Sequence, residues 1–218
     1  MTSLAARLHA VLPQTQCTRC GYPDCESYAA AMAGGEAAHN QCPPGGAEGV
    51  RRLAAILGRP ELPLYPANGL EGPRTLAVID EDWCIGCTLC LKACPTDAIL
   101  GLNKHMHTVI EPYCTGCELC VPVCPVDCIA LVDASGARTG WDAWSEPQAQ
   151  QALERYESRK LRLQREEAEH AQQLEHKAEA KLADLPAQTH GAHGPEADRK
   201  RAIIEAALAR ARAQRQPR

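Results

Sequence analysis

The sequence predicts an α+β protein with a small helical domain, a pseudo-twofold α+β domain and a long helical C-terminal tail. Three observations support this prediction. All 13 cysteines of the 218-residue chain precede residue 129. Within this cysteine-rich region, one segment repeats itself with a period of 30 residues. The rest of the chain is rich in Ala, Glu, Gln, Lys and Arg, and it includes a long stretch without Gly or Pro that favours a helix.

The N-terminal domain, residues 1–58, is expected to contain three short helices. Leucines recur at helical spacing near the start of the chain, where Ser3 is a suitable N-cap. Asp24 precedes a run of small residues, so a second helix should begin there and carry Cys25 in its first turn. The third helix should end at Gly58, since glycine readily adopts the left-handed conformation of a helix end. The expected helices cover residues 3–12, about 24–35 and 47–57.

A second domain, residues 74–135, is expected after a linker rich in proline and glycine at residues 59–73. This domain contains the repeat, in which CIGCTLCLKACPTDAI (84–99) aligns with CTGCELCVPVCPVDCI (114–129). A short run with strand character, LAVID or HTVIE, precedes each copy. Two copies of one unit suggest that strands and helices are related by a pseudo-twofold axis.

The C-terminal tail is expected to be a charged helical extension, residues 136–194, followed by a basic helix, residues 195–218. Neither Gly nor Pro occurs between 148 and 185, which predicts one long helix there. A flexible break is predicted at 186–195, where Pro, Gly and His accumulate. The last helix should cover about 196–214.

Each copy of the repeat carries the pattern C-x2-C-x2-C-x3-C followed by proline. A [4Fe–4S] cubane needs one thiolate for each of its four irons, and three closely spaced cysteines can supply three of them. In two-cluster ferredoxins the fourth cysteine of each run binds the other cluster. Zinc sites use two separated cysteine pairs instead, so zinc is disfavoured here. The predicted ligands are Cys84, Cys87, Cys90 and Cys124 for one cluster and Cys114, Cys117, Cys120 and Cys94 for the other.

A further set of four cysteines lies in the N-terminal domain with the spacing C-x2-C-x4-C-x16-C. Four thiolates are sufficient for one cubane or for one tetrahedral zinc ion, and the spacing leaves both alternatives open. The four residues are Cys17, Cys20, Cys25 and Cys42.

Three more residues near the second cluster loop could affect a cluster. Cys128 aligns with Ala98 in the repeat, so we expect a small buried thiol next to a cluster. A redox-active thiol or a spare ligand is the alternative for Cys128. His105 and His107 alternate along a predicted strand, and we expect them on a solvated strand face, with cluster tuning or proton transfer as the alternative.

Charge is distributed unevenly along the chain. Residues 1–146 carry 16 acidic and 9 basic side chains, a net charge of −7, whereas residues 195–218 carry a net charge of +4. The basic tail has no aromatic residues on which bases could stack, so no nucleic-acid partner is expected. Contact with an anionic membrane surface would be peripheral at most.

Several functional classes are excluded by the sequence. No apolar run reaches the roughly 18 residues of a membrane-spanning helix, and the N-terminus does not have the pattern of a signal peptide. A cytoplasmic location is therefore expected, where disulfides are rare. No dinucleotide-binding glycine motif, P-loop or radical-SAM cysteine run occurs. Clusters fully ligated by cysteine leave no iron open to a substrate, which favours electron transfer over bond-making catalysis.

Two segments resemble a known family. The run LPQTQCTRCGYPDCESYAAAMAGGEAAHNQCPPGG resembles the small iron–sulfur domain of the B subunit of the Rnf/Rsx electron-transport complex. The run KHMHTVIEPYCTGCELCVPVCPVDCI resembles the ferredoxin part of the same protein, and both occur in the family's order over about residues 4–133. The resemblance implies a ferredoxin-like second domain and three [4Fe–4S] clusters, the first held by Cys17, Cys20, Cys25 and Cys42.

One departure from the family pattern concerns the start of the chain. Rnf B subunits usually begin with a hydrophobic membrane anchor, whereas the 16 residues before Cys17 form no membrane span. The sequence is therefore expected to be a short, soluble form of the Rnf B subunit without that anchor.

The expected function is to relay single electrons through three [4Fe–4S] clusters, between a redox donor protein and an acceptor. Rnf-type subunits are candidate partners, and the cytoplasmic face of the inner membrane is a candidate location. The chain would then be a non-catalytic carrier or one component of an oxidoreductase complex. The alternatives are a free-standing ferredoxin that serves another soluble reductase and a structural metal-binding scaffold.

Overall fold

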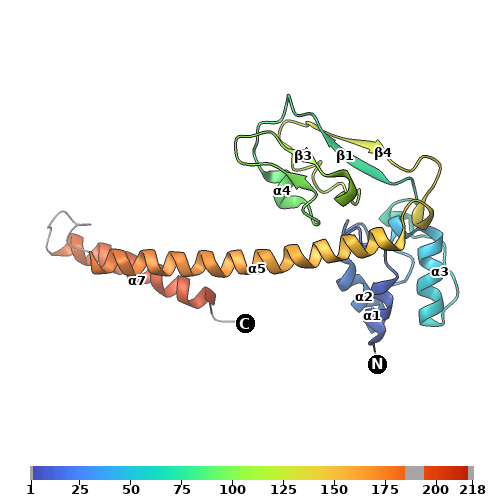
Figure 1. Ribbon diagram of the computed structural model, residues 1–218. Helices are drawn as coiled ribbons and strands as arrows, with labels where there is room; N and C mark the ends of the chain where they lie inside the picture. Colours follow the sequence, from blue (N-terminus) through green and yellow to red (C-terminus); the bar gives the residue numbers. More distant parts are fainter. Residues whose placement is uncertain (1, 185–193, 216–218) are drawn as a thin grey trace. The chain divides into compact units, whose positions relative to one another are not determined.

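The structure is a computed structural model that describes residues 2–184 and 194–215 (Figure 1). Its contacts divide the chain into two units, residues 1–159 and 160–218. Each unit is described by itself. Apart from its last two residues, the break predicted at 186–195 lies outside the described residues.

The three helices predicted at the N-terminus are confirmed. The Ser3 hydroxyl accepts a hydrogen bond from the backbone N–H of Ala6 and so caps the first helix. The Asp24 carboxylate caps the second helix by accepting from the N–H of Ser27 at 2.7 Å. Gly58 ends the third helix with φ of 62°. The helices are α1 (Leu4–Ala10), α2 (Cys25–Gly34) and α3 (Gly46–Leu57).

These helices share a small core that borders the first set of cysteines. Leu8, Tyr28 and Leu53 are almost fully buried in it. Cys25 belongs to the same cluster of buried side chains, and two further cysteines of the set pack against it. The loop that carries the cysteines is therefore held between the helices and does not extend into solvent.

The central segment consists of two antiparallel strand pairs and one short helix. Strand β1 (Thr75–Ile79) pairs with β4 (Ile129–Asp133), and β2 (Ile99–Leu100) pairs with β3 (Thr108–Val109). Helix α4 covers Leu89–Ala93. The predicted strand LAVID corresponds to β1, but only two residues of HTVIE form a strand. Strand β4 was not predicted, because its partner strand lies at the opposite end of the segment.

The proline-rich residues predicted as a linker are hydrogen-bonded to the N-terminal helices and loops. The N–H of Tyr65 donates to the carbonyl of Asn40 at 2.9 Å, and the side-chain amide of Asn40 donates to the carbonyl of Pro63. The amide of Asn68 donates to the carbonyl of Arg19 at 2.7 Å. This segment includes a short 3₁₀ turn, η2 (Pro66–Asn68), and its path is fixed by these contacts.

Residues 139–159, which we call the arm, return to the N-terminal segment after β4. The arm comprises a 3₁₀ turn, η4 (Gly140–Asp142), and the first turns of helix α5 (Glu146–Ala183). The Trp144 indole N–H donates to the carbonyl of Pro13 at 2.8 Å, and the guanidinium of Arg74 lies 4.8 Å from the Trp144 ring centre. The arm therefore joins the start of the chain to the central segment.

The second unit contains the rest of α5 and helix α7 (Pro195–Arg215). The two helices lie side by side (Figure 1), and Arg212 pairs with Glu175 at 3.0 Å and with Glu179 at 2.8 Å. The long helix predicted at 148–185 and the last helix predicted at 196–214 are thus confirmed. Across the described parts of the chain, no helix combines the length and apolarity needed to cross a membrane.

We predict that Trp144→Ala lowers the free energy of unfolding by about 3–5 kcal/mol, because it removes a large buried ring and a hydrogen bond between distant segments. Trp83→Ala is the matched control, since the Trp83 side chain is 70% exposed, and its effect should stay within about 0.5 kcal/mol. Urea titration under anaerobic conditions measures both. Equal effects would show that the arm does not stabilise the fold.

Candidate iron–sulfur sites

The first four cysteines line one cavity in the N-terminal segment. Three come from the loop before α2 and its first turn, and the fourth directly precedes a 3₁₀ turn, η1 (Pro43–Gly45). Gln16 is buried, and its side-chain oxygen accepts from the backbone N–H of Cys25 at 2.9 Å. This bond fixes the loop against the start of α2. The cysteines around the cavity are Cys17, Cys20, Cys25 and Cys42.

The eight cysteines of the repeat line two further cavities. In each case three cysteines of one run meet the fourth cysteine of the other run. One cavity is lined by Cys114, Cys117, Cys120 and Cys94. The other is lined by Cys84, Cys87, Cys90 and Cys124, with Cys128 as an additional thiol. These groupings have the same members as the ligand sets that the spacing predicts.

Cys128 differs from the other cysteines in its position. It is a fifth cysteine at a cavity that already has four predicted ligands, it is half-buried, and its Sγ lies 3.5 Å from that of Cys124. It lines the cavity from the side of the β1–β4 pair and also borders an open hollow on the surface. The small thiol predicted next to a cluster site is therefore partly accessible.

The loops that present the cysteines use the left-handed backbone region at equivalent positions of the two copies. Gly86 and Gly116 both have φ of 68°, and Thr88 and Glu118 both have φ of 66°. A Cβ atom at Gly86 would lie 2.5 Å from the backbone nitrogen of His105. Glycine is therefore required there both for its φ and for the close approach of two backbone segments.

Burial raises the pKa of thiols in each of the three cavities. Burial raises the pKa of Cys90 to about 11 and the pKa of Cys117 and Cys120 to about 12. Burial also raises the pKa of Cys25 and of Cys42 far above the ordinary value. These thiols hold their protons at neutral pH in the metal-free chain. Binding a metal group must release those protons, because thiolates are the ligands.

The arrangement of the donors fits a cluster better than a single ion. Within residues 2–184 and 194–215, no group of three or more His, Cys, Asp or Glu side chains lies close enough to hold one metal ion. A zinc ion would draw four sulfurs to about 2.3 Å from one centre. Four thiols around one shared cavity instead present soft donors to a larger group, as iron–sulfur clusters require.

Backbone N–H groups and one histidine ring nitrogen lie against the sulfur atoms. The N–H of His107 donates to Cys84 Sγ at 3.3 Å, and the N–H of Ala98 donates to Cys94 Sγ at 3.2 Å. The Nδ1 atom of the His107 ring lies 3.2 Å from Cys90 Sγ. Donors of this kind stabilise negative charge on thiolates and are one of the means by which proteins set cluster potentials.

The prediction of a solvated strand face is wrong for His107, although His105 is exposed. The side chain of His107 is 1% exposed, and its Nε2 atom is buried without a hydrogen-bond partner. The physical reason is that β3 begins only at Thr108, so His107 precedes the strand and turns inward. Gly101 provides the space, since a Cβ there would lie 2.8 Å from Cγ of the ring.

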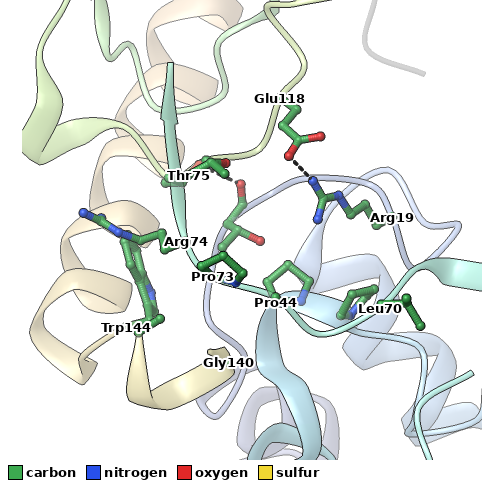
Figure 2. A pocket seen from close by; sticks show the side chains of 15 residues that line it. Arg19, Pro44, Leu70, Pro73, Arg74, Thr75, Glu118, Gly140 and Trp144 are labelled. Atoms are coloured by element: carbon green, nitrogen blue, oxygen red, sulfur yellow. Dashed lines mark hydrogen bonds and ion pairs between the residues drawn. The ribbon is translucent and has the colours of Figure 1, made fainter. Parts of the chain in front are cut away.

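The N-terminal cavity and the Cys114 cavity adjoin one cleft, shown in Figure 2. The Thr115 hydroxyl donates to the carbonyl of Thr15 at 3.0 Å within buried surroundings. Arg19 and Glu118 form an ion pair at 2.5 Å across the cleft, and the two side chains point toward each other in Figure 2. Residues next to the first cysteine set therefore contact residues next to Cys114 directly.

The arm contacts the Cys114 cavity from the other side. The Arg155 guanidinium lies 3.6 Å from the centre of the Tyr113 ring and donates to the carbonyls of Thr96 at 2.7 Å and Asp97 at 3.0 Å. Tyr156 donates to the carboxylate of Asp24, the residue that caps α2. A single helical turn of the arm thus binds residues next to two of the cysteine sites.

Comparison with known proteins identifies the family. The family model described as "4Fe-4S dicluster domain" matches residues 77–131, and the one described as "Putative Fe-S cluster" matches residues 12–44. Curated relatives named as the B subunit of an ion-translocating oxidoreductase complex are similar over the same region. The relative from Azoarcus is 60% identical over 108 residues, which are 50% of this chain and 59% of the relative. The relative from Alkalilimnicola ehrlichii is 54% identical over 147 residues, which are 66% of this chain and 78% of the relative.

The chain belongs to this family of B subunits. The relative from Stutzerimonas stutzeri agrees, with 52% identity over 146 residues and 75% of its length covered. The chain spans about three fifths of the Azoarcus relative. No solved structure matches the chain. Membership of the family and the two family models identify the chain as an iron–sulfur protein.

Several residues of these sites could not be predicted from the sequence. Gln16 and Thr115 are ordinary polar residues whose roles depend on burial. Arg155 lies in a highly charged helix, and the pattern there does not distinguish it from its neighbours. The sequence feature that could have indicated the buried position of His107 is Gly101, because an unexplained glycine beside a strand often makes room for a close neighbour.

We predict that His107→Ala makes the reduction potential of the nearest cluster more negative, because it removes a ring nitrogen 3.2 Å from Cys90 Sγ that would donate a hydrogen bond to the thiolate once Cys90 binds iron. Hydrogen bonds to charged acceptors contribute about 1.5–3 kcal/mol. The neighbouring exposed residue offers a matched control, since His105→Ala should leave all potentials unchanged. Redox titration followed by EPR measures both. A potential unaffected by loss of the His107 ring would exclude the proposed hydrogen bond.

Proposed function

We propose that this chain is an electron-transfer protein that holds three [4Fe–4S] clusters. The observation that carries the proposal is the grouping of twelve cysteines around three cavities, four to each cavity. The family supports iron–sulfur electron transfer in general, and the grouping supports the number three. When bound, each cluster would supply one-electron redox chemistry.

The ligands we propose follow the cavities. Cys17, Cys20, Cys25 and Cys42 would hold the first cluster. Cys114, Cys117, Cys120 and Cys94 would hold the second, and Cys84, Cys87, Cys90 and Cys124 the third. Apolar side chains around these thiols exclude water, and the N–H donors described above stabilise the thiolates.

We infer that the central segment, residues 74–135, is a pseudo-twofold ferredoxin-like domain. The strand registers support this inference. Val78 pairs with Ala130, and the residues one repeat away, Thr108 and Leu100, pair in the same way. The shared φ values of the two cysteine loops support it as well. The N-terminal segment, residues 1–58, would then be a separate iron–sulfur domain.

The partners we propose are a redox donor and a redox acceptor, among them other subunits of an ion-translocating oxidoreductase complex. The names of the relatives support this proposal, since they are subunits of such a complex. A cytoplasmic position with peripheral attachment to the complex fits the net negative charge of residues 1–146 and the charged helices that follow.

Iron, sulfide and zinc analysis of protein purified without oxygen tests the proposal. We expect about 12 iron atoms per chain, no zinc and EPR signals of interacting reduced clusters. Cys25→Ser should lower the iron content to about 8, because one site loses a ligand, whereas Cys128→Ala should leave it at about 12. About 8 iron atoms with one zinc in the unmodified chain would instead make residues 17–42 a zinc site, and the three-cluster proposal would fail.

A further inference from the structure

We propose that an open hollow beside the Cys84 cavity is the docking site for a basic redox partner that inserts an arginine side chain. The hollow is lined by Val78, Asp80, Trp83, Val126, Asp127, Cys128 and Ala130. This inference rests on the proposed function, because the partner would exchange electrons with the site beneath the hollow. The internal repeat indicates which side chain such a partner would present to the hollow.

The equivalent surface, 30 residues away along the repeat and next to the Cys114 site, shows the occupied version. There the arm covers Tyr113, Thr96 and Asp97, and Arg155 supplies the central contact. The guanidinium lies on the Tyr113 ring and donates to two consecutive carbonyls. A second arginine, Arg159, pairs with the Asp97 carboxylate at 3.3 Å. The occupant that fits this surface is therefore a helix with arginines on one face.

The residues one repeat away form the same surface without an occupant. Trp83 corresponds to Tyr113, and Val126 and Asp127 correspond to Thr96 and Asp97. Trp83 is 70% exposed, and Asp127 is exposed as well. Within the described parts of the chain, neither forms an ion pair or a cation–π contact. The aromatic ring and the carboxylate are thus available to a second guanidinium.

Charge and apolar exposure around the hollow favour a basic protein partner. Asp80, Glu81 and Asp82 are all exposed next to Trp83, and they add negative charge to that of Asp127. Ile85 is 57% exposed beside them. An exposed apolar patch with an acidic rim is typical of a protein interface, and complementary charge would speed association and specify orientation.

The hollow also adjoins one of the candidate cluster sites. Cys128 lines both the hollow and the cavity that contains Cys84 and Cys124. A partner that docks here would therefore approach one iron–sulfur site closely. At the arm-covered Cys114 site, Cys94 and Cys114 are buried and closed to such a partner. The arm leaves the Cys84 site as the accessible end of the central segment.

The test uses cytochrome c, a strongly basic haem protein, as the probe. The full chain with its clusters is reduced with dithionite, and the second-order rate of cytochrome c reduction is measured by stopped flow at low and high salt. Glu81→Lys with Asp82→Lys reverses the charge beside the hollow. Glu36→Lys with Glu61→Lys is the matched control, since it changes the net charge equally at exposed positions of the N-terminal half.

We expect the reversal at the hollow to slow cytochrome c reduction about tenfold at low salt and much less at high salt, because salt screens the attraction. The control pair should change the rate by less than about twofold. Trp83→Ala should slow the reaction severalfold at both salt concentrations, since it removes the stacking surface. Glu81→Gln with Asp82→Gln should give an intermediate rate, so the result does not depend on one variant.

The outcomes separate this inference from the proposed function. Absence of bound iron or of cluster EPR signals from the purified unmodified chain would contradict the proposed function. Full iron content together with equal rates for the hollow and control variants would overturn the docking site alone. A rate that depends on the hollow, with iron content unchanged, would establish that electrons leave or enter at the Cys84 side.

Discussion

Burial of cysteine thiols is the constraint on which the rest of this structure depends. The chain has no phenylalanine and few other aromatic residues, so a large aromatic-rich core is ruled out. Of the nine buried residues in the core of the central segment, four are cysteines: Cys90, Cys94, Cys114 and Cys120. A core made of potential ligands gains much of its stability when the ligands are bound, so folding and cluster binding should be closely coupled.

The same constraint explains the loops. Thiols that must face a common centre require backbone turns that ordinary helices and strands do not provide. The repeat therefore uses left-handed residues at the same positions in both copies, with Gly86 and Gly116 where backbones approach most closely. The strands are short and serve mainly to close the two ends of the segment. Regular secondary structure here supports the cysteine loops and adds Ala77, Ile79, Ile99 and Ile129 to the same core.

The arm makes the two cysteine sites of the repeat structurally unequal. By sequence the two cysteine sites of the repeat present equivalent surfaces, but Arg155 and Trp144 of the arm connect the Cys114 site to the N-terminal segment. One cysteine site thereby becomes internal, next to the first site through the contact of Thr115 with Thr15. The other remains at the surface beside Trp83. The two copies of the repeat are similar in sequence. The arm, which lies outside the repeat, makes one cysteine site internal and leaves the other at the surface.

The sequence by itself determined the features that depend on neighbours along the chain. Ser3, Asp24 and Gly58 set helix ends through local hydrogen bonds and local backbone freedom, and the cysteine spacing predicted which thiols would meet. Only the tertiary structure decided the features that depend on distant segments. These are the pairing of β4 with β1, the inward turn of His107 and the contact of the arm with the Cys114 site. No local pattern encodes them, because each is stabilised by burial against residues far away in the chain, and that burial exists only once the chain has folded.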